Sequence, residues 1–229
     1  MKFGVVTFPG SNCDQDMIYV LKDLLGQQVE HLWHKDTDLK QVDMVIIPGG
    51  FSYGDYLRSG AIAKFSPIMT EVIQHANRGG YVLGICNGFQ ILTEAGLLEG
   101  ALLHNNTQKF ICKNVFLKPG SSTAAPSMDL ERSQAFKIPI AHGEGRFFAS
   151  ADTLKSIQDN DQVMFQYCDE QGIVSEEANP NGSLHAIAGI TNKSKNVFGM
   201  MPHPERAADA HLGNKDGVAL FESILNHCS

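Results

Sequence analysis

Residues 81–90 read Tyr-Val-Leu-Gly-Ile-Cys-Asn-Gly-Phe-Gln, and they constrain the fold more than any other segment. Their apolar start is typical of a buried strand, and a helical pattern begins near Asn87. Between the two lies Cys86, with Gly84 two residues before it and Gly88 two residues after it. This is the spacing of a nucleophile elbow, a tight strand-to-helix turn that aims free helix N–H groups at the central side chain. The segment therefore predicts a reactive thiolate at Cys86, with a small buried cysteine in a glycine-rich turn as the alternative.

Short apolar runs alternate with helix-length amphipathic segments along the chain, a pattern typical of an α/β fold with a parallel sheet. In the first half we expect strands at 2–8, 28–33, 44–47 and 81–85, and helices at 12–25 and 67–77. In the second half we expect strands at 110–117, 136–141, 162–167, 172–176, 186–190 and 197–201, and a helix at 216–227. Residues 119–126 read as a surface loop. No repeat or linker divides the sequence, so we expect one domain over residues 1–229.

Charge and hydropathy argue against two classes of partner. The net charge is -7 and no cluster of Lys and Arg occurs, so nucleic-acid binding has no electrostatic support. No apolar stretch approaches the roughly 20 residues that span a bilayer. Residues 1–8 read as a first strand and not as a signal peptide. We therefore expect a cytoplasmic protein without a membrane or nucleic-acid partner.

The cysteines are odd in number and scattered, and no pair has Cys-x-x-Cys spacing: Cys13, Cys86, Cys112, Cys168 and Cys228. Reduced thiols in the cytosol are the simplest account. Cys112 and Cys168 fall in strand-like segments, so we expect both in the core. Cys13 stands at the start of the first helix, with no base near it in the sequence. No pattern indicates a metal site.

A catalytic cysteine needs a base, and the base needs a group that orients it. His203 directly follows a predicted strand, in the segment Pro-His-Pro-Glu. In an open α/β sheet the ligand crevice lies beyond the carboxyl ends of the strands, where Cys86 also lies. Glu205 is two residues further on and near enough to bond the far ring nitrogen. The alternative is a rigid surface turn, which the presence of the elbow disfavours.

The third requirement is an oxyanion hole. Gly49, Gly50 and Phe51 follow the buried strand 44–47, so this loop opens on the same sheet edge. We expect one donor to be the N–H of Gly50 or Phe51 and the other the N–H of Asn87. A plain glycine-rich turn is the alternative. The segment is not a P-loop, so no ATP site of that kind is predicted.

Together these elements resemble the triad glutamine amidotransferases over the whole chain. Residues 84–90 resemble the nucleophile motif of that family, and residues 202–205 resemble its base motif. Residues 8–14, 48–61 and 141–147 are similar to the branch that serves as the separate glutaminase subunit of a purine-biosynthetic synthetase. The resemblance implies a three-layer, flavodoxin-like α/β fold with a mostly parallel central sheet and extra strands in the second half.

The resemblance also implies a reaction. Cys86 would attack the side-chain amide carbon of glutamine while backbone donors near Gly50 and Asn87 hold the oxyanion. His203 would protonate the leaving ammonia and then activate the water that releases glutamate from the thioester. Glu205 would orient His203.

Partners and further binding residues follow from the same resemblance. Gln90, Asn105, His142 and Arg146 are candidates for the glutamine pocket; Glu144, on the loop of His142 and Arg146, could bind glutamine or the partner. The partner would be an ATP-dependent synthetase, with a further small subunit, that converts formylglycinamide ribonucleotide to formylglycinamidine ribonucleotide. ATP and Mg would bind to that synthetase, and this chain would need no cofactor. Residues 119–130 and the region of Arg58 are candidate docking surfaces.

Two rival functions remain at this stage. A cysteine peptidase or deglycase-like hydrolase on a related sheet also uses a cysteine elbow, although the late Pro-His-Pro-Glu segment disfavours it. A binding or scaffold protein with a retired site is the other rival, and it conflicts with the presence of Cys86, His203 and Glu205 together.

Overall fold

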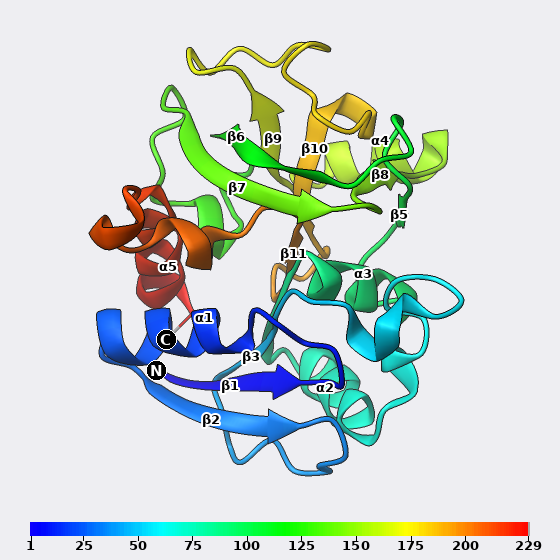
Figure 1. Ribbon diagram of the computed structural model, residues 1–229, viewed down its shortest axis with the longest axis vertical. Coiled ribbons are helices and arrows are strands. Elements are labelled where there is room, and N and C mark those ends of the chain that lie inside the picture. Colours follow the sequence, from blue (N-terminus) through cyan, green and yellow to red (C-terminus); the bar gives the residue numbers. More distant parts are fainter. Residues whose placement is uncertain (229) are drawn as a thin grey trace.

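The computed structural model describes residues 1–228, and its centre is a nine-stranded sheet (Figure 1). The strands follow the spatial order β2 (Gln28–Trp33), β1 (Lys2–Thr7), β3 (Met44–Ile47), β4 (Tyr81–Ile85), β11 (Val197–Met200), β10 (Ile187–Thr191), β9 (Val163–Cys168), β6 (Ile111–Pro119) and β7 (Phe136–His142). Neighbours from β2 to β11 are parallel, and neighbours from β11 to β7 are antiparallel. A separate pair joins β5 (Ala101–Leu103) and β8 (Arg146–Phe148).

The helices are α1 (Asp14–Tyr19, continued by a π-helical turn over Val20–Leu24), α2 (Pro67–Asn77), α3 (Asn87–Glu94), α4 (Ala151–Asp159) and α5 (Asp216–His227). Of these, α1, α2 and α3 pack against the parallel strands, whereas α5 packs against β7. The connection from β1 to β2 and the connection from β3 to β4 run in opposite directions along the sheet. Because such crossovers are right-handed, α1 and α2 lie on opposite faces. Short 3-10 turns complete the elements at Ser52–Asp55, Ala63–Phe65, Ala125–Ser127, Leu184–Ala186, Pro204–Ala207 and Ala210–Leu212. The predicted three-layer α/β class is confirmed.

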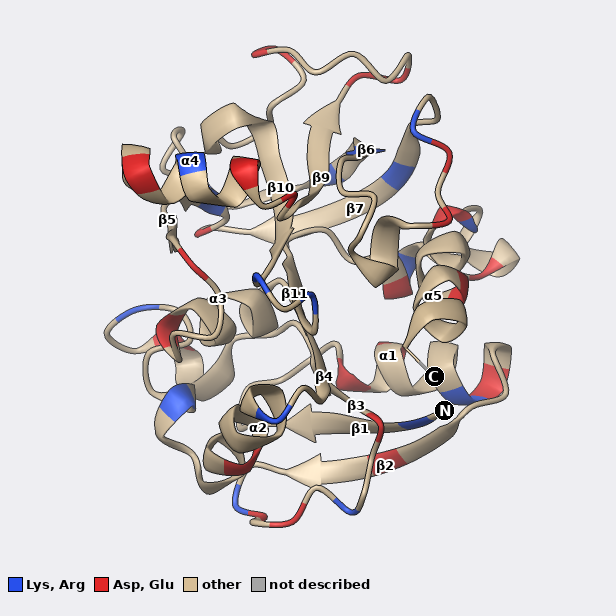
Figure 2. Ribbon diagram, turned by 180° about the vertical axis from the view of Figure 1, so that it is seen from behind, with Lys and Arg blue, Asp and Glu red and all other residues tan. Residues whose placement is uncertain are grey.

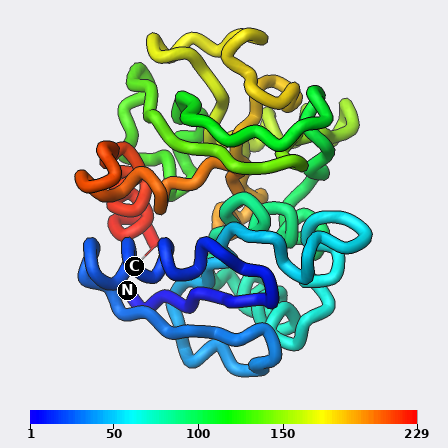
Figure 3. Tube along the Cα trace, viewed as in Figure 1, coloured from blue at the N-terminus to red at the C-terminus, as the bar shows by residue number. Residues whose placement is uncertain are grey.

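The two parts of the sheet bury their strands differently. Every residue of β3 and β11 is buried, as expected where helices cover both faces. Strand β7 instead alternates buried with more exposed positions, as in an antiparallel sheet with one face toward solvent. Figure 3 shows the division along the chain: blue and cyan segments occupy one end of the molecule, and green and yellow segments occupy the other.

Several expectations for the second half are wrong. Residues 172–176 form no strand, while β5, β8 and α4 were not predicted. The segment 119–126 is not a free surface loop: Ser121 and the turn Ala125–Ser127 are buried, and Ser223 of α5 donates to the carbonyl of Ala125. Cys112 is exposed and not in the core, whereas Cys168 is buried as expected.

Lys and Arg are dispersed over the described residues. Figure 2 shows Lys and Arg as short, separate blue segments among red and tan ones. Within residues 1–228, no helix has the length and apolar character needed to cross a membrane.

Candidate active site

The elbow predicted at Cys86 is formed by the junction of β4 and α3. Cys86 has φ 51° and ψ -106°, a backbone conformation that costs a residue with a side chain about 1–3 kcal/mol. Its flanking glycines allow the helix to lie close to the sheet: a Cβ at Gly88 would lie 1.9 Å from the carbonyl oxygen of Ile47, and one at Gly84 would lie 2.6 Å from the backbone of Gly88. Cys86 is 5% exposed, and its N–H donates to the carbonyl of Met200.

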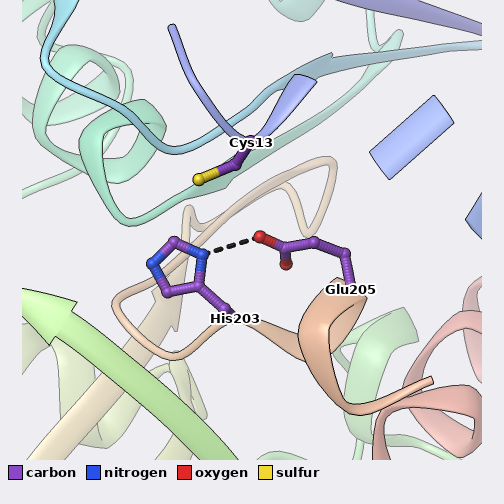
Figure 4. Close-up of side chains that lie close together, drawn as sticks. All are labelled: Cys13, His203 and Glu205. Carbon is purple, nitrogen blue, oxygen red and sulfur yellow. Dashed lines mark hydrogen bonds and ion pairs between the residues drawn. The ribbon is translucent and has the colours of Figure 1, made fainter. Parts of the chain in front are cut away.

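His203 and Glu205 form a buried pair just beyond β11. The ring nitrogen Nδ1 of His203 lies 2.6 Å from Oε1 of Glu205, and both side chains are at most 2% exposed (Figure 4). The 3-10 turn Pro204–Ala207 returns Glu205 toward the ring, and the N–H of His203 donates to the carbonyl of Pro139 in β7. Burial disfavours the imidazolium, but the charges of Glu205 and Cys86 outweigh it and raise the pKa of His203 well above its ordinary value.

The candidate nucleophile, Cys86, and the candidate base, His203, both lie beside Gly49. A Cβ at that position would lie 2.7 Å from Cε1 of His203 and 3.4 Å from Cβ of Cys86, so only glycine leaves both side chains in place. Cys86 and His203 line one cavity of about 150 Å³, together with Cys13 and Arg206. Within residues 1–228, Nε2 of His203 has no hydrogen-bond partner. That nitrogen is therefore free to exchange a proton in the cavity.

The geometry narrows the expected oxyanion donors. The N–H of Phe51 already donates to the carbonyl of Gly10, at 2.9 Å. The N–H groups of Gly50 and of Asn87, the first residue of α3, donate to no acceptor among the described residues. Gly50 has φ 150°, and a Cβ there would lie 2.8 Å from the backbone of Ser11. Of the two loop candidates, Gly50 is thus the free donor, while Phe51 lines the cavity.

A second cavity, of about 140 Å³, opens on the other side of Cys86. Gln90 and His142 line it, as does Glu144, which was expected to bind glutamine or the partner. Asp55, which was not among the candidate residues, also lines it. Burial, with a contribution from Glu144, raises the pKa of Asp55. Gln90 is held between neighbours, because it accepts from Nδ2 of Asn87 at 2.9 Å and donates to the carbonyl of Glu144. Asp55 lies in the segment 48–61, whose similarity to the glutaminase branch could have marked it as a candidate binding residue.

His142 is a neutral group in this cavity. It is 3% exposed, and burial, followed by the nearby charge of His203, lowers its pKa from 6.5 to about 4. Its Nδ1 lies 3.0 Å from Oδ1 of Asn105. Nδ2 of Asn105 donates to the carbonyls of Lys109 and His142, which fixes Oδ1 as the acceptor and Nδ1 of His142 as the donor.

Two of the candidate binding residues lie outside the cavity. Asn105 is fully buried behind it and supports His142 and the N–H of Gly145. Arg146 turns away, and its Nε donates to the carbonyl of His104. The structure therefore brings Gln90 and His142 to the cavity but does not bring Asn105 or Arg146 there.

Comparisons with known proteins show which family the chain is similar to. A family model described as a CobB/CobQ-like glutamine amidotransferase domain matches residues 1–217. The chain is 57% identical over 221 residues to the phosphoribosylformylglycinamidine synthase subunit PurQ of Synechocystis sp., covering 96% of this chain and 99% of that one. It is 52% identical to the PurQ subunit of Salinibacter ruber, with 100% and 97% covered.

Solved structures give the same result. A chain in the structure of PurLQS from Thermotoga maritima matches with a TM-score of 0.88 and 42% identity, covering 100% of this chain and 99% of that one. A glutamine amidotransferase from the same organism matches with a TM-score of 0.60 and 14% identity, covering 99% and 97%, which supports the fold alone.

Proposed function

The chain belongs to the family of CobB/CobQ-like glutamine amidotransferase domains, and from that membership we propose its reaction and the roles of its residues. It hydrolyses the side-chain amide of glutamine to glutamate and ammonia. The ammonia supplies a synthetase that converts formylglycinamide ribonucleotide to formylglycinamidine ribonucleotide in purine biosynthesis, in line with the names of its relatives.

The observation that carries the proposal is the buried His203–Glu205 pair, 2.6 Å apart, beside the strained turn at Cys86. The Cys86 thiolate attacks the amide carbon, and the carbonyl electrons move to oxygen. The N–H groups of Gly50 and Asn87 stabilise that oxyanion. Collapse of the intermediate breaks the carbon–nitrogen bond, and His203 gives its Nε2 proton to the departing ammonia.

A thioester between Cys86 and the γ-carbonyl group remains. His203, now neutral, takes a proton from the attacking water and later returns it to the Cys86 sulfur as glutamate leaves. Glu205 keeps Nδ1 protonated and stabilises the imidazolium that forms in each half of the cycle.

We place glutamine in the cavity that Gln90 and His142 line. Its amide end then reaches Cys86, and its α-ammonium meets the carboxylates of Asp55 and Glu144, because no Lys or Arg is among the described lining residues. Neutral His142 adds no charge that would repel the ammonium. Asn105 supports this wall from behind.

The wider setting is also a proposal. Residues 1–229 act as one amidotransferase domain, a view supported by a sheet that runs from β2 to β7. ATP and Mg bind to the synthetase partner, and a further small subunit completes the complex. The chain works in the cytoplasm, which its five free cysteines support.

The test is to react the purified complex with an electrophilic analogue of glutamine and to identify the modified residue by mass spectrometry. We expect modification of Cys86, loss of glutamine-dependent synthesis and survival of ammonia-dependent synthesis. A complex that cleaves peptides but never releases glutamate from glutamine would overturn the proposal, and so would failure to modify Cys86.

A further inference from the structure

A second thiol reaches the catalytic pair, and the proposed reaction does not use it. Cys13 follows β1 and precedes α1, and it is 2% exposed. Its sulfur, a ring nitrogen of His203 and a carboxylate oxygen of Glu205 all lie within 4.8 Å of one another (Figure 4). Cys13 is far from His203 and Glu205 in the sequence, but the three converge because β1 and β11 end at the same edge of the sheet.

The three groups match the donors that zinc prefers. Thiolate, imidazole and carboxylate are its usual protein ligands, at about 2.0–2.3 Å from the ion. In Figure 4 the Cys13 side chain points toward the His203–Glu205 pair. Nδ1 of His203 already faces Oε1 of Glu205 at 2.6 Å, so it is the ring nitrogen best placed to join Cys13 in binding an ion.

A second observation points to a ligand at this place. Oε2 of Glu205 is buried and has no hydrogen-bond partner within residues 1–228, although the residue is only 2% exposed. An unpaired carboxylate oxygen in a buried place is costly, and an ion bound beside it would remove that cost. Cys13 and His203, though not Glu205, line the cavity of about 150 Å³, so two of the three ligands border open space larger than a single ion needs.

Neighbouring charges leave room for a cation. Nη2 of Arg206 donates to the sulfur of Cys13 at 3.1 Å. Burial raises the pKa of the Cys13 thiol, and His203 and Arg206 oppose that shift only in part. The positive charge of Arg206 is partly balanced, because its Nε donates to the carboxylate of Asp16 at 3.0 Å. Two anionic ligands, Cys13 and Glu205, then offset the charge of a divalent ion.

We propose that Cys13, His203 and Glu205 bind a thiophilic divalent cation such as Zn²⁺, and that the bound ion switches off glutamine hydrolysis. The inhibition, though not the binding, rests on the function proposed above. Binding releases the thiol proton of Cys13 and the Nδ1 proton of His203, so affinity rises with pH. With Nδ1 occupied by the ion, Glu205 no longer orients the ring, and His203 cannot carry the second proton that the reaction requires.

The first arm of the test measures binding to the full-length chain with Co²⁺ as a spectroscopic substitute for Zn²⁺. We expect a thiolate-to-cobalt charge-transfer band in the wild type, in Cys86→Ser and in the matched control Cys112→Ser. The band disappears in Cys13→Ser and in Cys13→Ala, whose near-ultraviolet circular dichroism without metal verifies the fold. No band in the wild type, or loss of the band in Cys86→Ser, overturns the proposal.

The second arm titrates buffered Zn²⁺ into the complex during glutamine hydrolysis. Cys13→Ser keeps its activity without added metal, but the zinc concentration for half-inhibition rises about 100-fold, because a ligand is lost. In the control variant Cys112→Ser, Zn²⁺ inhibits at the same concentration as in the wild type. Mg²⁺ in place of Zn²⁺ does not inhibit the wild type. If Zn²⁺ inhibits Cys13→Ser and the wild type equally, the proposed metal site is wrong. If the chain binds Co²⁺ but the complex has no glutaminase activity, only the proposed function is wrong.

Discussion

The two sides of Cys86 each hold a buried histidine, and the two are driven to opposite charge states. On one side His203 lies 2.6 Å from a carboxylate oxygen of Glu205, and its pKa is raised. On the other side His142 lies 3.0 Å from an amide oxygen of Asn105, and its pKa falls to about 4. Burial is nearly equal, at 1% and 3% exposed.

The difference shows that the partner, not the depth of burial, sets the charge of a histidine in this site. Both partners accept from Nδ1, so both fix the ring in the same way. Only Glu205 adds a negative charge that compensates for the lost hydration of an imidazolium. In the proposed reaction, His203 therefore carries protons while His142 forms a neutral wall of the proposed glutamine cavity.

The largest effect is expected from replacing Cys86, which lines both cavities. Cys86→Ala should lower glutamine-dependent synthesis by the complex by at least about 10⁴-fold, because no thioester can form. Synthesis from added ammonia should survive. Parallel assays with the two nitrogen sources check this, and loss of both activities would assign Cys86 a structural role.

Glu205→Gln gives His203 the kind of partner that His142 has. Burial then dominates, the pKa of His203 falls, and the ring loses the charge that stabilises its protonated form. We expect kcat/KM for glutamine hydrolysis to fall by about 10³–10⁴-fold, as for loss of the carboxylate in other triads. His203→Ala should be worse still, so equal and total loss in the two variants would contradict the assigned roles. Glutamate release over a range of pH is the measurement.

The low pKa of His142 should also be visible in stability. The folded value of about 4 lies below the unfolded value of about 6.5, so between these pH values the unfolded chain binds more protons. The stabilisation is present above pH 6.5 and is lost as the pH falls toward 4, a loss of about 3 kcal/mol. Urea unfolding at pH 7 and pH 4.5 should show a smaller difference for His142→Gln than for wild type; identical differences would disprove the assignment.

Asn105→Asp makes the converse exchange and gives His142 a carboxylate. The pKa of His142 should rise by a unit or more, and its new charge should oppose protonation of His203 and binding of the substrate ammonium. We expect about a tenfold loss in kcat/KM at neutral pH, the equivalent of one pKa unit. Histidine NMR titration follows the pKa directly, and Asn106→Asp, at an exposed neighbour, is the control. An unchanged His142 titration would show that burial alone sets its charge.

The smallest effect tests the border of the glutamine cavity. Arg146→Ala should change KM for glutamine by less than about twofold, as for most substitutions away from a site. Its guanidinium donates to the carbonyl of His104 and does not line the cavity. A tenfold rise in KM would place Arg146 at the substrate.

The sequence could predict those parts of the site whose residues all lie in one short segment. The elbow at Cys86 and the pairing of His203 with Glu205 each depend on residues within a few positions. The meeting of Cys13 with His203 could not be predicted, because it depends on which strands end side by side. Arg146 and Asn105 do not line the cavity, and the sequence could not show this, because it indicates that a side chain is polar but not where the side chain points.

The same limit explains the errors in the second half of the fold. Residues 172–176 have strand-like composition, but the carboxylate of Asp169 accepts from the N–H groups of Gln171 and Ile173, which competes with pairing in a sheet. The helix α4 has only Ile157 fully buried, so its apolar pattern was weak, although Ser150 caps it by accepting from the N–H of Thr153.

The position of β11 has a consequence for the chain as it is made. Strand β4 completes its pairing only with β11, where Val82 aligns with Val197, and His203 follows directly after that strand. A ribosome releases the N-terminal part first. In an emerging polypeptide the proposed nucleophile, Cys86, is therefore made long before the proposed base, His203, and the two meet only after β11 has been made. We therefore expect the order of strands to delay the proposed hydrolysis of glutamine until β11 has paired with β4.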